Sequence, residues 1–335
     1  MTYQNILVLG GTGFVGQCLV DHLAAQGRRV CVPTRRRERG RELLVLPSVE
    51  VIEADIGDPA TLRALLAGRD AVINLVGILH DTGQAPRPGM SAGTPAAGRY
   101  GPAFAAVHVD LPRRLVEACR QQAVQRLLHV SALGASADGP SAYLRSKADG
   151  ERMVRDAPAL AATVFRPSVV FGSGDHFLNL FATLAAWLPI LLIGRPQARM
   201  QPVWVRDLAG AMATALDARA TFGQAYEICG PTIYTLRDLV QFAARAAGHP
   251  RPVLGLPDSL AYLMAGAFEL LPGPTLLSRD NLRSLTLDSV ASVQPYEPAP
   301  ELAMHPSPLE PEAALFLAGM HPRTRYAGFR VKARR

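Results

Sequence analysis

Short apolar runs alternate with helix-like segments through the first half of the chain. The apolar runs predict strands over residues 6–9, 30–33, 49–52, 71–75, 127–130 and 162–165. Among the segments between them, apolar residues recur at helical spacing over residues 14–26, 59–66, 111–122 and 142–155. Strands that alternate with helices in this way form a parallel sheet with helices on both faces. We therefore predict an α/β fold, a doubly wound parallel sheet followed by a smaller, mostly helical C-terminal domain.

The pattern changes after residue 172. Residues 177–193 and 260–271 are almost wholly apolar, and Pro189 interrupts the first segment while Pro272 follows the second. A membrane-spanning helix needs about 20 apolar residues, so we expect buried helices that pack in a core. The alternatives are that these segments line an apolar substrate cavity or touch a membrane surface.

This pattern divides the chain into three parts. We expect the sheet domain over residues 1–172, a smaller substrate domain over residues 173–291, and an irregular segment with a basic tail over residues 292–335. Residues 201–225 are expected to return to the sheet. Residues 81–102 interrupt the sheet domain and are crowded with glycine, proline, alanine and serine. That composition predicts a flexible insertion, with a substrate lid as the alternative.

Composition limits the function classes. The 335 residues are 49% hydrophobic and 19% charged, which is enough for a sizeable core. The cysteines are scattered singly, so we expect neither a disulfide nor a metal site. They are Cys18, Cys31, Cys119 and Cys229.

Much of the net charge of +7 comes from two clusters. Neither has the repeated aromatic residues of a base-stacking surface, so no nucleic-acid partner is expected. The tail cluster would suit an anionic membrane face or an acidic partner protein, or would simply be solvated. The first five residues lack the features of a secretory signal, so we expect a cytoplasmic protein, with peripheral contact at the inner face of the cytoplasmic membrane as the alternative. The clusters are Arg35, Arg36, Arg37, Arg39 and Arg41, and Arg323, Arg325, Arg330, Lys332, Arg334 and Arg335.

A glycine-rich turn follows the first predicted strand. Gly10 permits the tight turn, Gly13 lets phosphates approach the backbone, and Gly16 lets the helix pack closely on the strand. The free N–H groups and the positive end of the helix dipole can then hold a pyrophosphate. The sequence therefore predicts a Rossmann-type site for NAD or NADP. The predicted contacts are Gly10, Gly11, Thr12, Gly13, Phe14, Val15 and Gly16.

The end of the second predicted strand indicates which dinucleotide binds. An acidic residue at this point would bond the ribose hydroxyls of NAD and repel a 2′-phosphate, whereas Arg35 or Arg36 offers a donor fork suited to phosphate. Because no acid occurs between residues 30 and 37, we predict NADP(H) in preference to NAD(H). Residues after the third and fourth strands should flank the adenine and the nicotinamide ribose. They are Asp55 and Ile56, and Asn74, Leu75, Val76 and Gly77.

Three residues form a candidate catalytic set. Tyr143 and Lys147 lie four apart, on one face of a predicted helix. A tyrosine with a pKa near its usual value of about 10 is a poor acid or base at neutral pH. A nearby ammonium would lower that pKa, and this is what proton transfer to or from a substrate oxygen needs. Ser131 follows the fifth strand directly, where its hydroxyl could hold the same oxygen.

Together these features resemble the extended and atypical short-chain dehydrogenase/reductase superfamily, which includes NAD-dependent epimerases and dehydratases. Residues 166–172 and 201–209 fit the same pattern, and the resemblance covers residues 5–239. His108 is a departure, since many extended members have an asparagine there that takes part in a proton relay through the lysine. The resemblance implies further cofactor contacts by Arg166, Pro167, Ser168 and Val169.

A narrower resemblance points to one branch of this superfamily. Four segments are similar to the nucleotide-binding accessory subunit of mitochondrial complex I and its bacterial relatives: residues 73–77, 129–135, 143–147 with Glu151, and 171–179. An intact Ser131, Tyr143 and Lys147 set implies an NADP(H)-dependent oxidoreductase, and the apolar segments suggest a lipophilic or quinone-related small-molecule substrate. The branch implies the alternative, a non-catalytic protein stabilised by NADPH that assists a respiratory or quinone-biosynthesis assembly.

Overall fold

The computed structural model describes residues 2–81, 99–158, 160–271 and 275–320. The chain divides into two compact units. The first comprises Met1–Pro167, Arg206–Ile228 and Glu297–His305, and the second comprises Ser168–Val205, Cys229–Tyr296 and Pro306–Arg335. Among the described residues, none of the helices is both long enough and apolar enough to cross a membrane.

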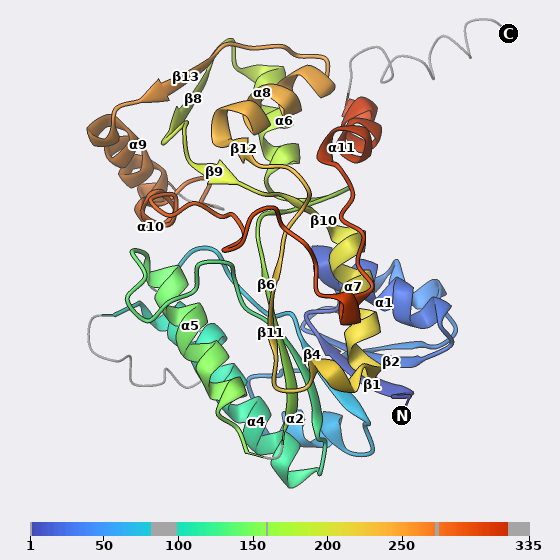
Figure 1. Cartoon of the computed structure of the whole chain (residues 1–335). Helices are drawn as coiled ribbons and strands as arrows, with labels where there is room; N and C mark the ends of the chain where they lie inside the picture. Colours follow the sequence, from blue (N-terminus) through green and yellow to red (C-terminus); the bar gives the residue numbers. More distant parts are fainter. Residues whose placement is uncertain (1, 82–98, 159, 272–274, 321–335) are drawn as a thin grey trace, which may run out of the picture. The chain divides into compact units, whose positions relative to one another are not determined.

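The first unit is built on a seven-stranded parallel sheet with the order β11-β6-β5-β4-β1-β2-β3. Helices α2, α4 and α5 cover one face, and α1 and α7 cover the other (Figure 1). The doubly wound parallel sheet predicted from the sequence is therefore confirmed. Its strands are β1 (Asn5–Leu9), β2 (Arg29–Thr34), β3 (Val49–Glu53), β4 (Ala71–Asn74), β5 (Arg126–Val130), β6 (Ala161–Pro167) and β11 (Ala225–Ile228). Its α-helices are α1 (Phe14–Ala25), α2 (Pro59–Leu66), α3 (Pro102–Phe104), α4 (Leu111–Gln121), α5 (Ala142–Arg155) and α7 (Val205–Asp217).

Short helical turns join these elements. A π-helix over Ala105–Asp110 leads into α4, and 3₁₀ turns cover Arg37–Gly40, Leu43–Val45, Arg219–Thr221 and Pro300–Leu302. In the first unit, α2 and α5 begin at polar caps. Asp58 accepts hydrogen bonds from the backbone at the start of α2, and Ser141 does so at the start of α5. These caps explain why α2 and α5 begin where the sequence predicted.

The chain order of the strands reverses between β1 and β4. Leu9 pairs with Asn74, and Asn74 pairs with His129 on the next strand. In an open parallel sheet, ligands bind at the carboxyl ends of the strands beside such a reversal. We therefore expect a ligand site among the residues that follow β1, β4 and β5.

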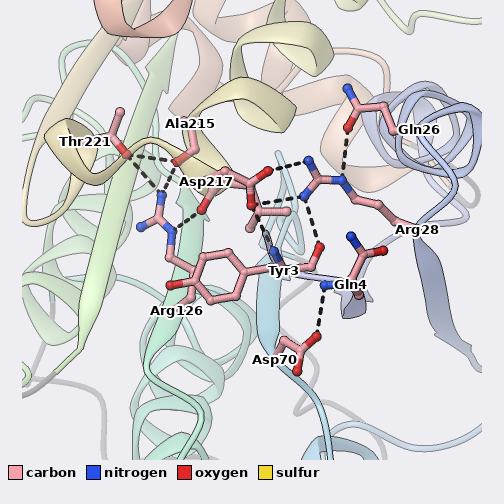
Figure 2. Close-up of polar contacts among 10 residues, drawn as sticks. Tyr3, Gln4, Gln26, Arg28, Asp70, Arg126, Ala215, Asp217 and Thr221 are labelled. Carbon is pink, nitrogen blue, oxygen red and sulfur yellow. Dashed lines mark hydrogen bonds and ion pairs between the residues drawn. The ribbon is translucent and has the colours of Figure 1, made fainter. Parts of the chain in front are cut away.

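The opposite edge of the sheet holds a buried arginine (Figure 2). Arg126, the first residue of β5, donates to the carbonyl oxygens of Ala215 and Leu216 at 2.6 and 2.9 Å. These carbonyls lie at the C-terminal end of α7, where a cation is favoured, and burial lowers the pKa of Arg126 to about 10. Beside it, Arg28 pairs with Asp217 at 2.6 Å. The two arginines fix the end of α7 to the sheet.

The described part of the second unit is mostly helical, with three pairs of short strands. Its helices are α6 (Leu178–Trp187), α8 (Leu236–Ala246), α9 (Asp258–Leu270), α10 (Arg279–Ser284) and α11 (Leu309–Leu317), followed by a 3₁₀ turn over Ala318–Met320. The strand pairs are β7 (Val170–Phe171) with β10 (Val203–Trp204), β8 (Leu191–Gly194) with β13 (Val253–Leu256), and β9 (Arg199–Met200) with β12 (Tyr234–Thr235). Side chains of α6, α8, α11, β8 and β13 form its main core.

The apolar segment 177–193 contains the packed helix α6, which ends at Trp187 before Pro189, and the segment continues into the strand β8. Two other predictions for this part of the chain need correction. The helix α9 was expected to be buried, yet Leu263 and Leu270 are 70% and 87% exposed, because it packs through the smaller side chains of Ala261 and Ala265. Within residues 292–335, the segment before the basic tail was expected to be irregular, but it contains α11. Proline is tolerated at the start of a helix, so the prolines around residue 309 do not prevent one. The basic tail, residues 323–335, lies outside the described residues.

Candidate functional site

The turn after β1 has the backbone geometry that only glycines allow. Gly10 adopts a φ of +81°, in the left-handed region. A Cβ atom at Gly16 would lie 2.2 Å from the carbonyl oxygen of Gly10, and one at Gly10 would lie 3.2 Å from the backbone carbon of Leu75. The turn therefore packs tightly against α1 on one side and against the residues that follow β4 on the other.

The N-terminal end of α1 is open to an anion. Gly13 is the exposed N-cap residue, and among the described residues no side chain caps the helix. Its first turn, which includes Phe14 and Val15, contains no acidic residue. The backbone N–H groups of a first turn have no partner within the helix, so they can bind phosphate oxygens. This cradle fits the pyrophosphate of a dinucleotide, and Gly11 and Thr12 form its remaining part.

The two arginines predicted to select the cofactor lie just beyond β2. Arg35 and Arg36 are both exposed. The hydroxyl of Thr34 at the strand end donates to the carbonyl of Arg36 at 3.1 Å, which fixes the backbone there. A Cβ atom at Gly40 would lie 3.5 Å from Cγ2 of Thr12. The segment after the arginines therefore returns to the glycine turn.

Asp55 and Ile56, which follow β3, differ in their exposure to solvent. Asp55 is exposed, and its carboxylate accepts a hydrogen bond from the backbone N–H of Gly57 at 2.8 Å. Ile56 is half-buried and packs against the core of the sheet domain. Both lie at the carboxyl edge of the sheet, where the sequence predicted contacts with an adenine.

Asn74 organises the backbone after β4. Its side chain is buried, and its Oδ1 accepts a hydrogen bond from the N–H of Val76 at 3.2 Å. Its Nδ2 lies 3.1 Å from Nδ1 of His129. The N–H of Leu75 donates to the carbonyl of Leu9 at 3.0 Å. These bonds hold residues 75–77 beside the glycine turn.

Ser131 and Lys147 meet at the end of β5. The Lys147 ammonium donates to the carbonyl oxygen of Val130 at 2.7 Å, directly before Ser131. Burial lowers the pKa of Lys147 to about 8. The Oγ atom of Ser131 is buried and has no hydrogen-bond partner among the described residues. A buried hydroxyl without a partner is uncommon, and it is well placed to bind the oxygen of a ligand.

Tyr143 lies one helical turn before Lys147 on α5. Its ring contacts the rings of Phe104 and His108, with centroids 6.1 and 5.7 Å away. Burial raises the pKa of Tyr143 to about 12. The prediction that a nearby ammonium lowers this pKa is therefore wrong for this structure. The physical reason is that removal of water around the phenol destabilises the phenolate, while the Lys147 ammonium is held by the carbonyl of Val130.

His108 joins this group of residues. It is buried within the π-helix, and its Nε2 accepts a hydrogen bond from the N–H of Ile78 at 3.1 Å. Its Nδ1 must then carry the proton, and it lies 2.8 Å from Oγ of Ser146. Burial and the charge of Lys147 hold the pKa of His108 well below its usual value. A Cβ atom at Gly77 would lie 3.7 Å from both Nε2 of His108 and Nζ of Lys147, so these groups converge on Gly77.

The last two residues of β6 and the two that follow it, which were predicted to contact the cofactor, have different surroundings. The Arg166 guanidinium forms an ion pair with the buried carboxylate of Glu151 on α5. Pro167 accepts a hydrogen bond from the N–H of Leu133 at 3.0 Å. Ser168 and Val169 belong to the second unit, where the Ser168 hydroxyl donates to the carbonyl of Ser289 at 2.7 Å. The side chains of Arg166 and Ser168 therefore have partners within the protein.

The two ends of the expected insertion are both fixed. The Asp81 carboxylate accepts hydrogen bonds from the N–H groups of Ala103 and Phe104, at 3.4 and 3.1 Å. Arg99 pairs with the buried Asp149 on α5 at 3.1 Å. Residues 82–98 lie outside the described residues, so neither a flexible insertion nor a lid is tested.

The arrangement of this site agrees with a comparison against known protein families. The model of the NAD dependent epimerase/dehydratase family matches residues 6–229. The chain belongs to this family. The match confirms the superfamily resemblance seen in the motifs, and it includes the glycine turn, Ser131, Tyr143 and Lys147. Epimerase/dehydratase proteins bind nicotinamide dinucleotides, and the cradle at α1 fits such a cofactor.

The proteins that this chain resembles have different names. The NADH dehydrogenase [ubiquinone] 1 alpha subcomplex subunit 9 of Arabidopsis thaliana is 30% identical over 302 residues, which cover 85% of this chain and 70% of the relative. A protein of Caulobacter vibrioides named ceramide reductase is 30% identical over 266 residues, covering 78% and 76%. The X-ray structure of Pal from Bacillus thuringiensis has the same fold, with a TM-score of 0.69, 15% identity and coverage of 94% and 98%.

Proposed function

We propose that this epimerase/dehydratase family protein is an NADP(H)-dependent oxidoreductase acting on a lipophilic carbonyl or hydroxyl compound, or on a quinone-related one. The observation that supports it most is the convergence at Gly77. The Lys147 ammonium and the His108 ring approach this backbone position, and Ser131 follows the carbonyl that holds Lys147. The glycine turn is packed against the residues just before Gly77. A phosphate cradle and polar groups suited to proton transfer thus share one edge of the sheet.

Each residue has a role that its surroundings favour. A bound nicotinamide supplies or accepts the hydride. Tyr143 carries its proton at neutral pH and would donate it to a carbonyl oxygen as the carbon is reduced, although burial raises its pKa to about 12 and so makes it a weaker acid than a free tyrosine. Ser131 would donate a hydrogen bond to the same oxygen and so gain the partner it lacks among the described residues. Lys147 would contact the nicotinamide ribose beside Gly77.

Two features support the finer choices of cofactor and substrate. Arg35 and Arg36 are exposed at the end of β2, and no acid occurs between residues 30 and 37, which favours a 2′-phosphate and hence NADP(H). The Caulobacter relative is named ceramide reductase, and this name describes a reductase with a lipid substrate. That relationship supports a lipophilic substrate for this chain.

The variant Tyr143→Phe tests the proposal. We expect NADPH oxidation with lipophilic ketones and quinones to fall by about a hundredfold or more, while NADPH affinity stays within about twofold. Tyr234→Phe is the matched control, because it removes a hydroxyl that donates to Glu310 in the second unit. If Tyr143→Phe left every NADPH-dependent activity and the cellular quinone pool unchanged, the proposed reaction would be wrong.

The Arabidopsis relative favours a second candidate function. In this alternative, the protein binds NADPH permanently and serves as a non-catalytic accessory or assembly factor of a membrane respiratory or quinone-biosynthesis assembly. A redox enzyme must release NADP after each turnover, whereas a structural cofactor need not leave. We would measure the release of bound NADPH by chasing its fluorescence with excess NADP. Exchange within seconds supports the oxidoreductase, and retention for hours supports the accessory role.

The accessory role also makes a prediction about the basic tail. Deletion of residues 323–335, which include Arg323 and Arg335, should release the protein from its membrane or respiratory assembly. The measurement is co-fractionation of the full chain and the truncated chain with membranes. If the full chain does not associate with membranes or with an assembly, the accessory role fails.

A further inference from the structure

The helix α9 in the second unit packs with its small residues inward. Ala261 and Ala265, one turn apart, are its buried positions. They let the helix approach β8 closely, since a Cβ atom at Gly194 would lie 2.9 Å from that of Ala261. Leu263 and Leu270 point outward and are mostly exposed. A helix at the surface of a globular protein usually buries its large apolar side chains, so this orientation leaves an apolar surface uncovered.

The strand β8, which contacts α9, and its partner β13 also carry exposed leucines. Leu192 of β8 pairs in register with Leu254 of β13, and each is about half exposed, at 49% and 50%. Side chains alternate between the two faces of a strand. The Leu192 side chain therefore lies on the same face of β8 as the position of a Cβ at Gly194, which would contact Ala261 of α9. Figure 1 shows α9 and the two strands in one part of the second unit. We call this surface the apolar face: Leu192, Leu254, Leu260, Leu263, Leu270 and Leu271.

A groove with basic side chains borders the apolar face. It has a volume of about 880 Å³, and the side chains that line it include Leu263, Leu270 and the acidic Glu269 of α9 and Arg279 and Arg283 of α10. The Arg279 side chain pairs with Glu269 at 2.8 Å. Arg283 is exposed, and no ion pair of its guanidinium is found among the described residues. The groove therefore combines apolar walls with an available cation.

The charges on α9 itself are compensated. The helix has two charged residues, and both are acidic. Asp258 pairs with Arg195 at 2.7 Å, and Glu269 pairs with Arg279. The acidic side chains of α9 thus do not oppose an anionic surface, and Arg283 adds a positive charge beside the leucines.

We propose that the apolar face is a peripheral docking surface for an anionic phospholipid bilayer. The leucines would enter the boundary between headgroups and acyl chains, and Arg283 would lie at the level of the phosphates. The 13 residues of α9 are too few to span a bilayer, so the helix would lie along its surface. Exposed leucines on the outer side of a helix can enter a fluid layer without a matching partner shape, which favours a bilayer over a protein partner. This inference is independent of the proposed reaction.

Sedimentation of the full chain with vesicles tests the docking surface. We expect binding to vesicles of phosphatidylcholine with phosphatidylglycerol, and weaker binding to phosphatidylcholine alone. Leu263→Glu combined with Leu270→Glu should weaken binding by about tenfold or more. Arg283→Glu should weaken binding to the anionic vesicles and reduce its dependence on salt. All these side chains are exposed, and thermal unfolding of each variant reports whether the fold is kept.

The control is Leu315→Glu on α11. Leu315 is 76% exposed, and Figure 1 draws α11 at the other end of the second unit from α9. This variant should bind vesicles like the unmodified chain. Three results would overturn the proposal: no vesicle binding by the full chain, equal binding by the double leucine variant, or equal loss with Leu315→Glu. Self-association that only the double leucine variant loses, without vesicle binding, would instead assign the face to a second copy of the chain.

Discussion

Replacing Gly16 by alanine tests the glycine cradle most directly. The new Cβ atom would lie 2.2 Å from the carbonyl oxygen of Gly10, whereas real Cβ contacts stay beyond 3.0 Å. The start of α1 must therefore move away from the turn by about 1 Å. Such overpacking typically costs about 1–3 kcal/mol of stability. The moved helix would lose one or more hydrogen bonds to a bound pyrophosphate, each worth about 1.5–3 kcal/mol when one partner is charged.

The expected result is a loss of NADPH affinity by about ten- to a hundredfold or more. Fluorescence titration with NADPH measures the affinity, and urea unfolding measures the stability. Gly210→Ala is the matched control, since Gly210 lies within α7 and no described neighbouring atom would come within 4 Å of its Cβ. That variant should gain about 0.5–1 kcal/mol, because alanine favours a helix more than glycine does. It should leave the NADPH affinity unchanged.

Two outcomes would refute this reasoning. If Gly16→Ala bound NADPH as tightly as the unmodified chain, the close packing of α1 on the turn would not be needed to hold the cofactor. If Gly210→Ala weakened NADPH binding equally, the loss would reflect the substitution of any helical glycine rather than the contact with Gly10.

Three further predictions concern stability and cofactor choice. Arg126→Met should lower the free energy of unfolding in urea by about 2–5 kcal/mol, since it leaves buried carbonyls without a donor. Arg120→Met should change it by less than about 1 kcal/mol, because the Arg120 pair with Glu117 is exposed; equal losses would contradict this. Burial lowers the pKa of His129 to about 3. Between pH about 6.5 and 3, this histidine is therefore protonated in the unfolded chain and neutral in the folded chain. Stability should fall as the pH falls through this window, and His129→Gln should make the fall shallower; an unchanged slope in urea unfolding at several pH values would argue against it. Arg35→Ala combined with Arg36→Ala should weaken NADPH binding by about tenfold or more and leave NADH binding unchanged; parallel losses in titrations with both would exclude a contact with the 2′-phosphate.

Most of the sheet could be predicted because each predicted strand or helix is indicated by residues that lie next to one another in the sequence. The six strands predicted from the sequence are short apolar runs, whereas β11 has the mixed sequence Ala-Tyr-Glu-Ile and was not predicted as a strand. Helices α2 and α5 have capping residues, Asp58 and Ser141, directly before them. The glycine turn is also local, since Gly10 and Gly16 contact each other across six positions. The residues that follow the strands could then be placed at one edge of the sheet.

Contacts between distant residues could not be predicted in the same way. Nothing near His108 in the sequence indicates that its ring accepts a hydrogen bond from the N–H of Ile78. The pKa of Tyr143 depends on how deeply α5 buries the phenol, which its spacing from Lys147 does not reveal. In α9, leucines and alanines both recur at helical spacing. The close approach of Gly194 decides that the alanines face inward.

The unpartnered hydroxyl of Ser131 would serve the proposed activity, but it lowers the stability of the folded protein. A buried polar group without a partner costs about 1–3 kcal/mol, and this cost falls on the protein whenever no ligand is bound. Among the described residues, nothing relieves it. Selection for thermal stability alone would therefore replace Ser131 with alanine, and a stabilised form of this protein would be at risk of losing the group that we propose to hold the substrate oxygen. If the serine is retained in stabilised variants that remain active, their gains must come from positions away from this edge of the sheet.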